Sequence, residues 1–144
     1  MKRLEGLLVL LPALTGCGTP TLESTLADVV EETGLTYASC GAYRITQDEC
    51  GPDATTPPAE VQCLIDAVAA CRPAHLTLTR GTLEGDPIDT AYVVRPEGTG
   101  CSVITIVDTR ADQFGGQSLT TSQCQTFTRV DGCPWVTTSG CAAM

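Results

Sequence analysis

Cysteine is the residue type in this sequence that could perform the widest range of chemistry. The chain of 144 residues contains nine cysteines, which can carry a lipid, bind a metal, act as nucleophiles or form disulfides. Such a cysteine content in a small domain is typical of an oxidising compartment, where disulfides persist. Because nine is an odd number, we expect one cysteine to have a role of its own.

The first cysteine, Cys17, closes a leader-like segment. Residues 1–3 form a short basic start, and residues 6–14 are an apolar stretch too short to cross a bilayer, which takes about 20 residues as a helix. Leu14-Thr15-Gly16-Cys17 then ends the segment. This arrangement resembles the lipobox of bacterial lipoproteins, in which an aliphatic residue, a small residue and Gly or Ala precede an invariant Cys.

The resemblance implies an exported, lipid-anchored protein. Residues 1–16 would be a signal peptide, Cys17 would carry a diacylglyceryl group, and residues 17–20 would form the lipidated Cys and a short tether. Gly18 stands where an Asp would retain a Gram-negative lipoprotein in the inner membrane, so the resemblance implies the outer membrane, facing the periplasm or the cell surface. The alternative is an ordinary signal peptide whose Cys17 stays free or forms a disulfide.

Eight cysteines remain, and an even number suits four disulfides, although 105 pairings are possible. Cys63 and Cys71 should not pair, because eight residues of one helix would separate them by about 12 Å. We favour Cys40–Cys63 with Cys50–Cys71; the alternative is Cys40–Cys71 with Cys50–Cys63. In the C-terminal half, either Cys101 pairs with Cys133 and Cys124 with Cys141, or Cys101 pairs with Cys124 and Cys133 with Cys141; we adopt the first.

Residues 35–141 also resemble uncharacterised cysteine-rich secreted proteins and lipoproteins of high-GC bacteria. Those proteins have a Cys-Gly before a helix, a Cys in that helix, a Gly-x-Asp-like turn between strands and two late cysteines. The matching residues are Cys40-Gly41, Cys63, Gly85-Asp86, Cys124 and Cys141. The resemblance implies no particular activity.

Other residue types offer little catalytic chemistry. The single histidine, His75, has no Gly-x-Ser-x-Gly motif to accompany it, and the cysteine spacings match neither zinc, haem nor redox motifs. No Lys follows Cys17, which removes Schiff-base chemistry and a Walker-type phosphate loop from the mature chain. We therefore expect no enzyme, no catalytic residue, no metal and no cofactor.

The charge is acidic, with 17 Asp and Glu against eight Lys and Arg and a formal net charge of −9. Binding to a nucleic-acid backbone needs clustered Lys and Arg, so a nucleic-acid partner is not expected. Acidic residues surround two predicted turns: Glu84, Asp86 and Asp89 at the first, Asp108 and Asp112 at the second. We interpret them as turn residues; calcium binding or a glycosidase-like carboxylate pair are the alternatives.

Periodicity predicts two helices and then a run of strands. The first helix has Thr19 as its N-cap, Pro20 in its first position and Gly34 at its end; the second has Thr56 as its cap, Pro57 at its start and Arg72-Pro73 as its stop. Apolar residues recur at helical spacing in both: Leu22, Leu26, Val29 and Val30, then Val61, Leu64, Ile65 and Val68. Strands are predicted near residues 42–46, 76–79, 88–94, 101–108, 119–130 and 134–138.

These elements predict an α+β fold, with two N-terminal helices packed on one face of a four- to five-stranded antiparallel sheet and stapled by disulfides. Residues 21–144 would form this single domain. The first functional hypothesis is an envelope lipoprotein with a structural or protein-binding role and a protein partner in the envelope. The second is a module that binds a small molecule or inhibits an enzyme; the third, a hydrolase that uses the acidic turns, is the weakest.

Overall fold

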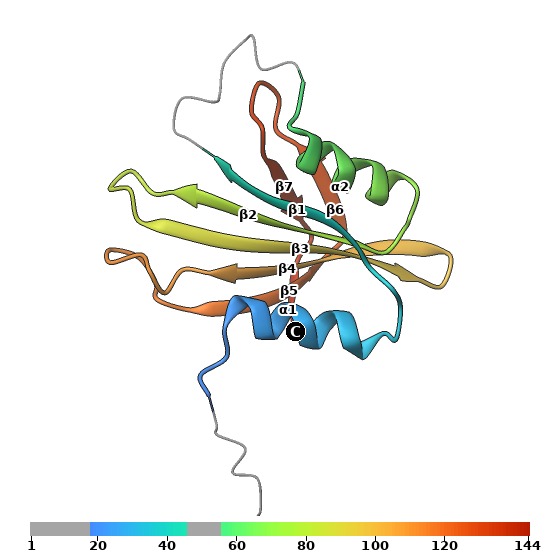
Figure 1. Cartoon of the computed structure of the whole chain (residues 1–144), viewed down its shortest axis with the longest axis horizontal. Coiled ribbons are helices and arrows are strands. Elements are labelled where there is room, and N and C mark those ends of the chain that lie inside the picture. The colour runs from blue at the N-terminus through green and yellow to red at the C-terminus, as the bar shows by residue number, and fades with distance from the viewer. Residues whose placement is uncertain (1–17, 46–55) are drawn as a thin grey trace, which may run out of the picture.

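The computed structural model describes residues 18–45 and 56–144, which form an α+β domain (Figure 1). Two helices and eight strands follow one another in the order α1 Leu22–Glu32, β1 Ala38–Ile45, α2 Ala59–Ala69, β2 Ala74–Gly81, β3 Pro87–Glu97, β4 Gly100–Asp108, β5 Leu119–Cys124, β6 Thr126–Arg129, β7 Val136–Ser139 and β8 Ala142–Ala143.

The main sheet has six strands in the order β1-β2-β3-β4-β5-β8, and β6 and β7 form a separate two-stranded sheet. The pair β1–β2 is parallel and the other pairs are antiparallel. The prediction of a purely antiparallel sheet of four to five strands is therefore wrong. The reason is α2, which connects β1 to β2: neighbouring strands joined through a helix run parallel.

The two helices lie on opposite faces of the sheet, not together on one face as predicted (Figure 1). Nor do both precede the sheet, because β1 comes between them. The central strands are buried on both sides: all four residues of Ala91–Val94 are buried, as are those of residues 102–106 in β4. Two covered faces need two covering layers, so the domain has three layers with the sheet in the middle.

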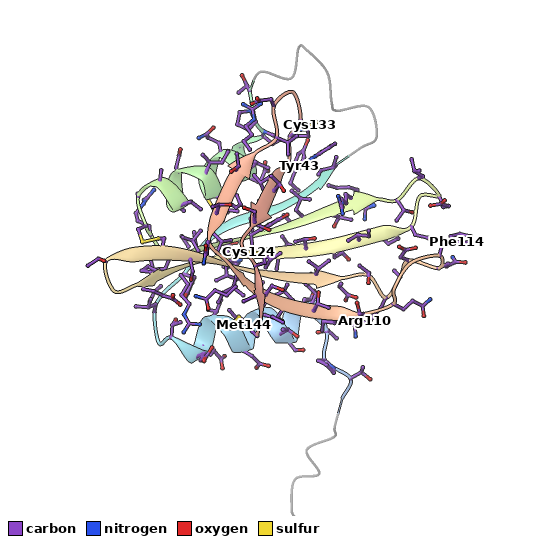
Figure 2. All side chains as sticks on the ribbon, turned by 180° about the vertical axis from the view of Figure 1, so that it is seen from behind. Tyr43, Arg110, Phe114, Cys124, Cys133 and Met144 are labelled. Carbon is purple, nitrogen blue, oxygen red and sulfur yellow. A yellow bond between two sulfur atoms is a disulfide. The ribbon has the colours of Figure 1, made fainter. Side chains whose placement is uncertain are left out.

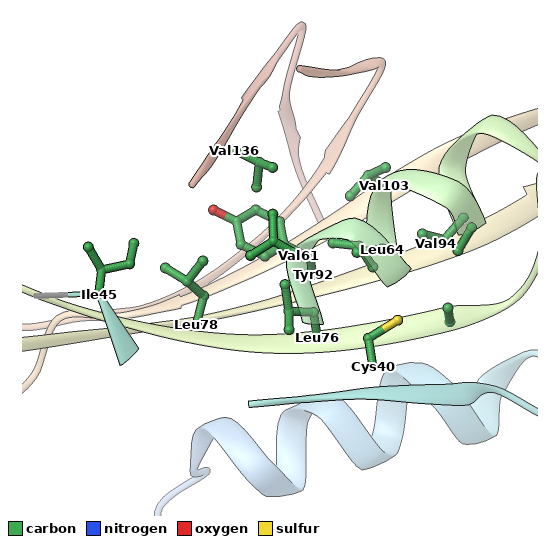
Figure 3. Close-up of a cluster of buried hydrophobic side chains, with 12 residues drawn as sticks. Cys40, Ile45, Val61, Leu64, Leu76, Leu78, Tyr92, Val94, Val103 and Val136 are labelled. Atoms are coloured by element: carbon green, nitrogen blue, oxygen red, sulfur yellow. The ribbon is translucent and has the colours of Figure 1, made fainter. Parts of the chain in front are cut away.

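One face is covered by α2 and by the β6–β7 hairpin. Leu64, Leu76 and Tyr92 belong to its core, and Val136 of β7 joins them (Figure 3). The ring of Tyr92 meets that of Phe127 edge to face, with ring centroids 5.8 Å apart. The hairpin is therefore packed on the sheet by aromatic contacts.

The opposite face is covered by α1, which buries Val29 against Ala91, Val93, Ile104 and Ile106 of the sheet. The helix begins at Leu22, two residues later than predicted, because Thr21 and not Thr19 is its N-cap. Thr21 and Ser24 cap each other: the Ser24 amide donates to the Thr21 hydroxyl at 3.0 Å, and the Thr21 amide donates to Ser24 Oγ at 2.9 Å. Gly34, with φ of 63°, follows the helix end as expected.

The second helix begins at Ala59 after Pro58, so the predicted cap Thr56 and start Pro57 lie outside it. Its buried residues are Val61, Leu64 and Ala67; Ile65 and Val68 are partly buried against the same core. Before it, β1 has an irregular register between Ser39 and Ala42, with Gly41 at φ of 93°. This bulge turns Cys40 and Ile45, five residues apart, towards the same core, which a regular strand of period two would not do.

The predicted strand 119–130 divides into β5 and β6, because the chain leaves the main sheet at Gln125. The Gln125 amide donates to the carbonyl of Ser139, so it already pairs with the end of β7. The residue at the end of the first predicted strand, Thr46, lies outside the described residues. The division places the β6–β7 hairpin above the α2 face, where it forms one wall of a cleft.

Candidate functional site

Cys17, the predicted lipidation site, lies outside the described residues, which begin at Gly18. The tether that would follow it is very short, since Thr21 already caps α1. Pro20, inside this tether, is in contact with the domain: Arg110 Nη1 donates a hydrogen bond to its carbonyl at 2.6 Å. The start of the domain is therefore held to its own body within three residues of Cys17.

The structure contains disulfides between Cys40 and Cys63, Cys71 and Cys101, and Cys124 and Cys141. Cys133 is also disulfide-bonded. The first and third pairs coincide with predicted ones. The bond between Cys71 and Cys101 contradicts both Cys50–Cys71 and Cys101–Cys133; Cys50 itself lies outside the described residues.

The position of Cys71 explains the error. The helix ends at Ala69, so Cys71 lies in the turn before β2 rather than in the helix, with φ of 49°. A non-glycine residue in this left-handed region is uncommon and redirects its side chain. Here the sulfur reaches Cys101 at the start of β4, with the two Cα atoms 5.6 Å apart.

Two of the acidic residues at the turns, Asp86 and Asp112, accept hydrogen bonds from backbone amides of the loops. The Asp86 carboxylate accepts a hydrogen bond from the Gln113 amide at 3.0 Å. Asp112 Oδ1 accepts from the amides of Phe114 and Gly115, both at 3.0 Å. This is the loop-building chemistry expected of Asp at turns.

Asp89 and Asp108 are directly paired neighbours on β3 and β4 and line a hollow of about 520 Å³ beside the start of α1. The Thr79 hydroxyl donates to Asp89, and Arg110 binds both oxygens of Asp108, at 2.8 and 2.6 Å. The hydrogen bonds from Arg110 hold the pKa of Asp108 below its ordinary value. A general acid needs the opposite shift, so this pair has the features of a structural ion-pair cluster.

His75 is the second residue of β2 and pairs in register with Val93, which places it on the α1 face. Its Nδ1 is buried and has no hydrogen-bond partner among the described residues. Burial lowers the pKa of His75. No hydrogen bond joins this ring to a Ser, Thr or Cys side chain among the described residues, so it has the features of a packed strand residue.

A cleft of about 200 Å³ lies between the sheet and the β6–β7 hairpin. Its floor is formed by Leu78, Thr90 and Tyr92 of β2 and β3, and its wall by Trp135 and Val136. The Tyr92 side chain extends towards Val136 at the start of β7 (Figure 3). The cleft therefore combines two aromatic rings with hydroxyl groups.

Arg80, at the end of β2, supplies the cleft with a positive charge. Its guanidinium makes no ion pair or hydrogen bond within the described residues, and the same holds for the hydroxyls of Tyr92 and Thr90. Burial raises the pKa of Tyr92, and the nearby Arg80 cation opposes this only in part, so the phenol stays a hydrogen-bond donor. A cation and hydroxyl groups beside aromatic rings in one cleft are features of a ligand site.

Sequence reasoning missed these cleft residues. Arg80 and Tyr92 come from strands in which apolar and polar residues alternate, and such a pattern does not indicate a binding site. Trp135 follows a loop that brings the chain back over the sheet, and no short sequence pattern predicts this path. The signal that was present is the single Trp in a chain with few aromatic residues. A large aromatic side chain that is only partly buried in so small a domain is worth testing as a binding residue.

Comparison with known proteins adds no relative: no family model, curated protein or solved structure matches the chain. Within the described ranges, no group of three or more His, Cys, Asp or Glu side chains could hold a metal ion. The helices of the described part are too short and too polar to cross a membrane. The functional argument therefore depends on the cysteines, the tether and the cleft.

Proposed function

We propose that this chain is an exported lipoprotein, attached to the cell envelope by a lipid on Cys17, and that it acts as a non-catalytic binding module. The observation that carries the proposal is the use of the cysteines. All seven described cysteines are disulfide-bonded, which indicates an oxidising environment outside the cytoplasm.

Counting the bonded cysteines assigns different roles to the two that remain, Cys17 and Cys50. Cys133 is bonded, and the other six described cysteines pair among themselves. With Cys17 assigned to the lipid, Cys50 is left as the partner of Cys133. Non-reducing peptide mapping tests this count: it should find Cys50 linked to Cys133, and a disulfide at Cys17 would contradict the lipid assignment.

Lipidation itself has a direct test. The Cys17→Ala variant should lose the mass of the diacylglyceryl group and move from the membrane fraction to the soluble fraction, because no other anchor is proposed. The Thr19→Ala variant, which leaves the lipobox intact, is the matched control and should remain membrane-bound. A Cys17→Ala protein that stays in the membrane fraction would refute the proposal.

The cleft beside the hairpin favours the binding of a small molecule over hydrolysis and over the binding of a protein partner. Of the carboxylates in the hydrolase hypothesis, the directly paired Asp89 and Asp108 are already bound by Thr79 and Arg110. For a protein partner, the outer edge of β1 is the obvious surface, but a bulge interrupts it. The cleft, by contrast, combines the aromatic rings of Tyr92 and Trp135 with the Arg80 cation, which makes no ion pair within the described residues.

The ligand class follows from those groups. The volume of about 200 Å³ is below the roughly 300–1,000 Å³ of sites for larger ligands, which suits a small molecule. Arg80 favours a carboxylate or another anion, and the rings of Trp135 and Tyr92 favour a planar or apolar body beside it. We therefore propose a small organic anion as the ligand.

The chain carries its own reporter for this test, since Trp135 is its only Trp and lines the cleft. Benzoate, glucuronate and inorganic phosphate are titrated against Trp fluorescence. Benzoate should give a saturable change, and Arg80→Gln should weaken its affinity about tenfold through loss of a charge-assisted contact. Arg72→Gln, an exposed Arg outside the cleft, is the control. If none of the three probes gave a saturable change in Trp fluorescence at concentrations up to about 10 mM, this ligand class would be excluded.

A further inference from the structure

Two large apolar side chains project into solvent from neighbouring loops. Leu83, in the β2–β3 turn, is 95% exposed, and Phe114, in the loop between β4 and β5, is 76% exposed. Phe114 is one of only two Phe residues in the chain. An exposed apolar pair of this kind marks an interaction surface more often than an isolated exposed residue does.

Hydrogen bonds hold the two loops in this position. Asp86 of the first loop accepts from the Gln113 amide of the second, which ties them together. The Asp112 carboxylate accepts from the Phe114 amide and lies so close to Gly115 that a Cβ there would collide with it. The Thr109 hydroxyl further closes the second loop by donating to the carbonyl of Gly116. The exposure of Phe114 therefore belongs to an ordered loop.

This apolar pair lies at the end of the domain from which the tether leaves. Arg110, four residues before Phe114, is the residue that binds the Pro20 carbonyl. Figure 2 shows Arg110 beside the start of the tether, and Phe114 farther out on the same side of the molecule, at the tip of its loop. Three residues, fully extended, span about 11 Å, so a lipid on Cys17 would hold the bilayer within that distance of Pro20.

We infer that Leu83 and Phe114 dock this end of the domain on the bilayer surface, beside the lipid on Cys17. The inference rests on the proposed lipid anchor and adds an orientation to it: the domain lies against the membrane with its loop end rather than turning freely about the tether. The cleft and α2 then lie on the far side of the sheet from α1, accessible to a ligand.

The charges around the two loops determine which kind of membrane surface the apolar pair can dock on. Glu84, Asp86 and Asp112 lie next to the apolar pair, so anionic headgroups would be repelled. The proposed partner is therefore a zwitterionic lipid surface such as phosphatidylcholine, into whose interfacial region the two side chains insert. A protein or a second copy of the chain is the competing occupant.

The experiment measures the depth of the loops in the membrane. The lipidated full chain is reconstituted in phosphatidylcholine vesicles that contain brominated lipid, with Phe114→Trp as reporter in a Trp135→Phe background. Bromine quenches Trp only within the bilayer, so this reporter should lose about half or more of its fluorescence. Thr99→Trp, in the β3–β4 turn at the other end of the sheet, is the control and should be unaffected. Equal quenching of both reporters, or none, would overturn the inference.

A second arm separates failure of docking from failure of the anchor. If mass spectrometry finds no lipid on Cys17, the proposed anchor fails, and the same reporters are tested on chains held to a chelating lipid by six histidines in place of Cys17. In a chain that has neither a lipid nor a histidine tag, the double variant Leu83→Ser, Phe114→Ser should partition into phosphatidylcholine vesicles about tenfold or more weakly than the natural residues do. Unchanged partition, or a dimer in vesicle-free solution that this double variant dissociates, would show that the pair does not serve the bilayer.

Discussion

The two faces of the sheet are covered by helices of equal length that are held in different ways. Helix α2 is tied by Cys63 to β1 and, through Cys71 just beyond its end, to β4. Helix α1 contains no cysteine and buries a single residue, Val29. At its two ends it is held by polar contacts: Arg110 binds the Pro20 carbonyl, and Arg95 lies 3.6 Å from Glu32.

On the α1 face, two buried polar atoms, His75 Nδ1 and Ser102 Oγ, have no hydrogen-bond partner among the described residues. The core of the α2 face consists mainly of aliphatic and aromatic groups. Disulfides therefore secure the face with the larger core, and the face nearest the tether depends on weaker contacts. We expect α1 to detach locally while the rest of the domain stays folded.

The largest expected effect is the loss of the disulfide under α2. Replacing Cys40 and Cys63 together with Ala should lower the free energy of unfolding by about 3 kcal/mol, because the bond closes a long loop in the unfolded chain. Urea unfolding followed by circular dichroism measures the loss. Hydrogen exchange should then accelerate in α2 but not in α1, which opens on its own; equal acceleration in both helices would contradict the comparison.

A matched pair of core substitutions compares the packing directly. Val61 of α2 is fully buried and Val29 of α1 is 7% exposed. Val61→Ala should cost about 2–3 kcal/mol, because the surrounding core is held by disulfides and cannot collapse into the gap. Val29→Ala should cost about 1 kcal/mol, since α1 can shift. Equal losses in urea unfolding would show that both faces are equally rigid.

The sequence allowed the class of fold, the two helices and most strand positions to be predicted, because these depend on local periodicity. The predicted arrangement of these elements was wrong because two signals in the sequence were not combined. A strand, a helix and a strand in succession already favour a parallel β1–β2 pair, and the unbroken apolar run Ala91–Val94 already indicates a strand buried on both faces. With both signals, the opposite placement of the helices was predictable.

The sites were less accessible to prediction. The Cys71–Cys101 pair depends on a helix that ends two residues early and on a left-handed residue, which no propensity identifies. The contact of Arg110 with Pro20 joins residues 90 positions apart, and the cleft exists only because the chain changes sheets at Gln125. Such long-range features follow from tertiary packing and have no local pattern.

Polar contacts at the ends of α1 offer a smaller and more local effect. Arg110→Gln should release the tether, so that the amides of the first helical turn exchange with solvent roughly two- to fivefold faster, as expected for loss of an exposed ion pair and its hydrogen bond. Arg95→Gln is the matched control and should accelerate exchange only near Glu32. If either variant accelerated exchange in α2, the two faces would not be independent.

The smallest effect concerns pH and again distinguishes the faces. Because burial lowers the pKa of His75 in the folded state, the unfolded chain binds its proton at a higher pH than the folded chain. The contribution of neutral His75 to stability is therefore complete above the ordinary pKa of about 6.5 and is lost as the pH falls below it. The pKa of Asp108 is lowered from an ordinary value of 3.8, so its contribution declines only at still lower pH. Between pH 7 and 5 the melting temperature should thus fall less for His75→Gln than for the natural chain, and hydrogen exchange should increase first in α1, which covers the same face of the sheet. Parallel pH profiles for the two proteins would show that the partly buried imidazole of His75 does not limit the stability of this face.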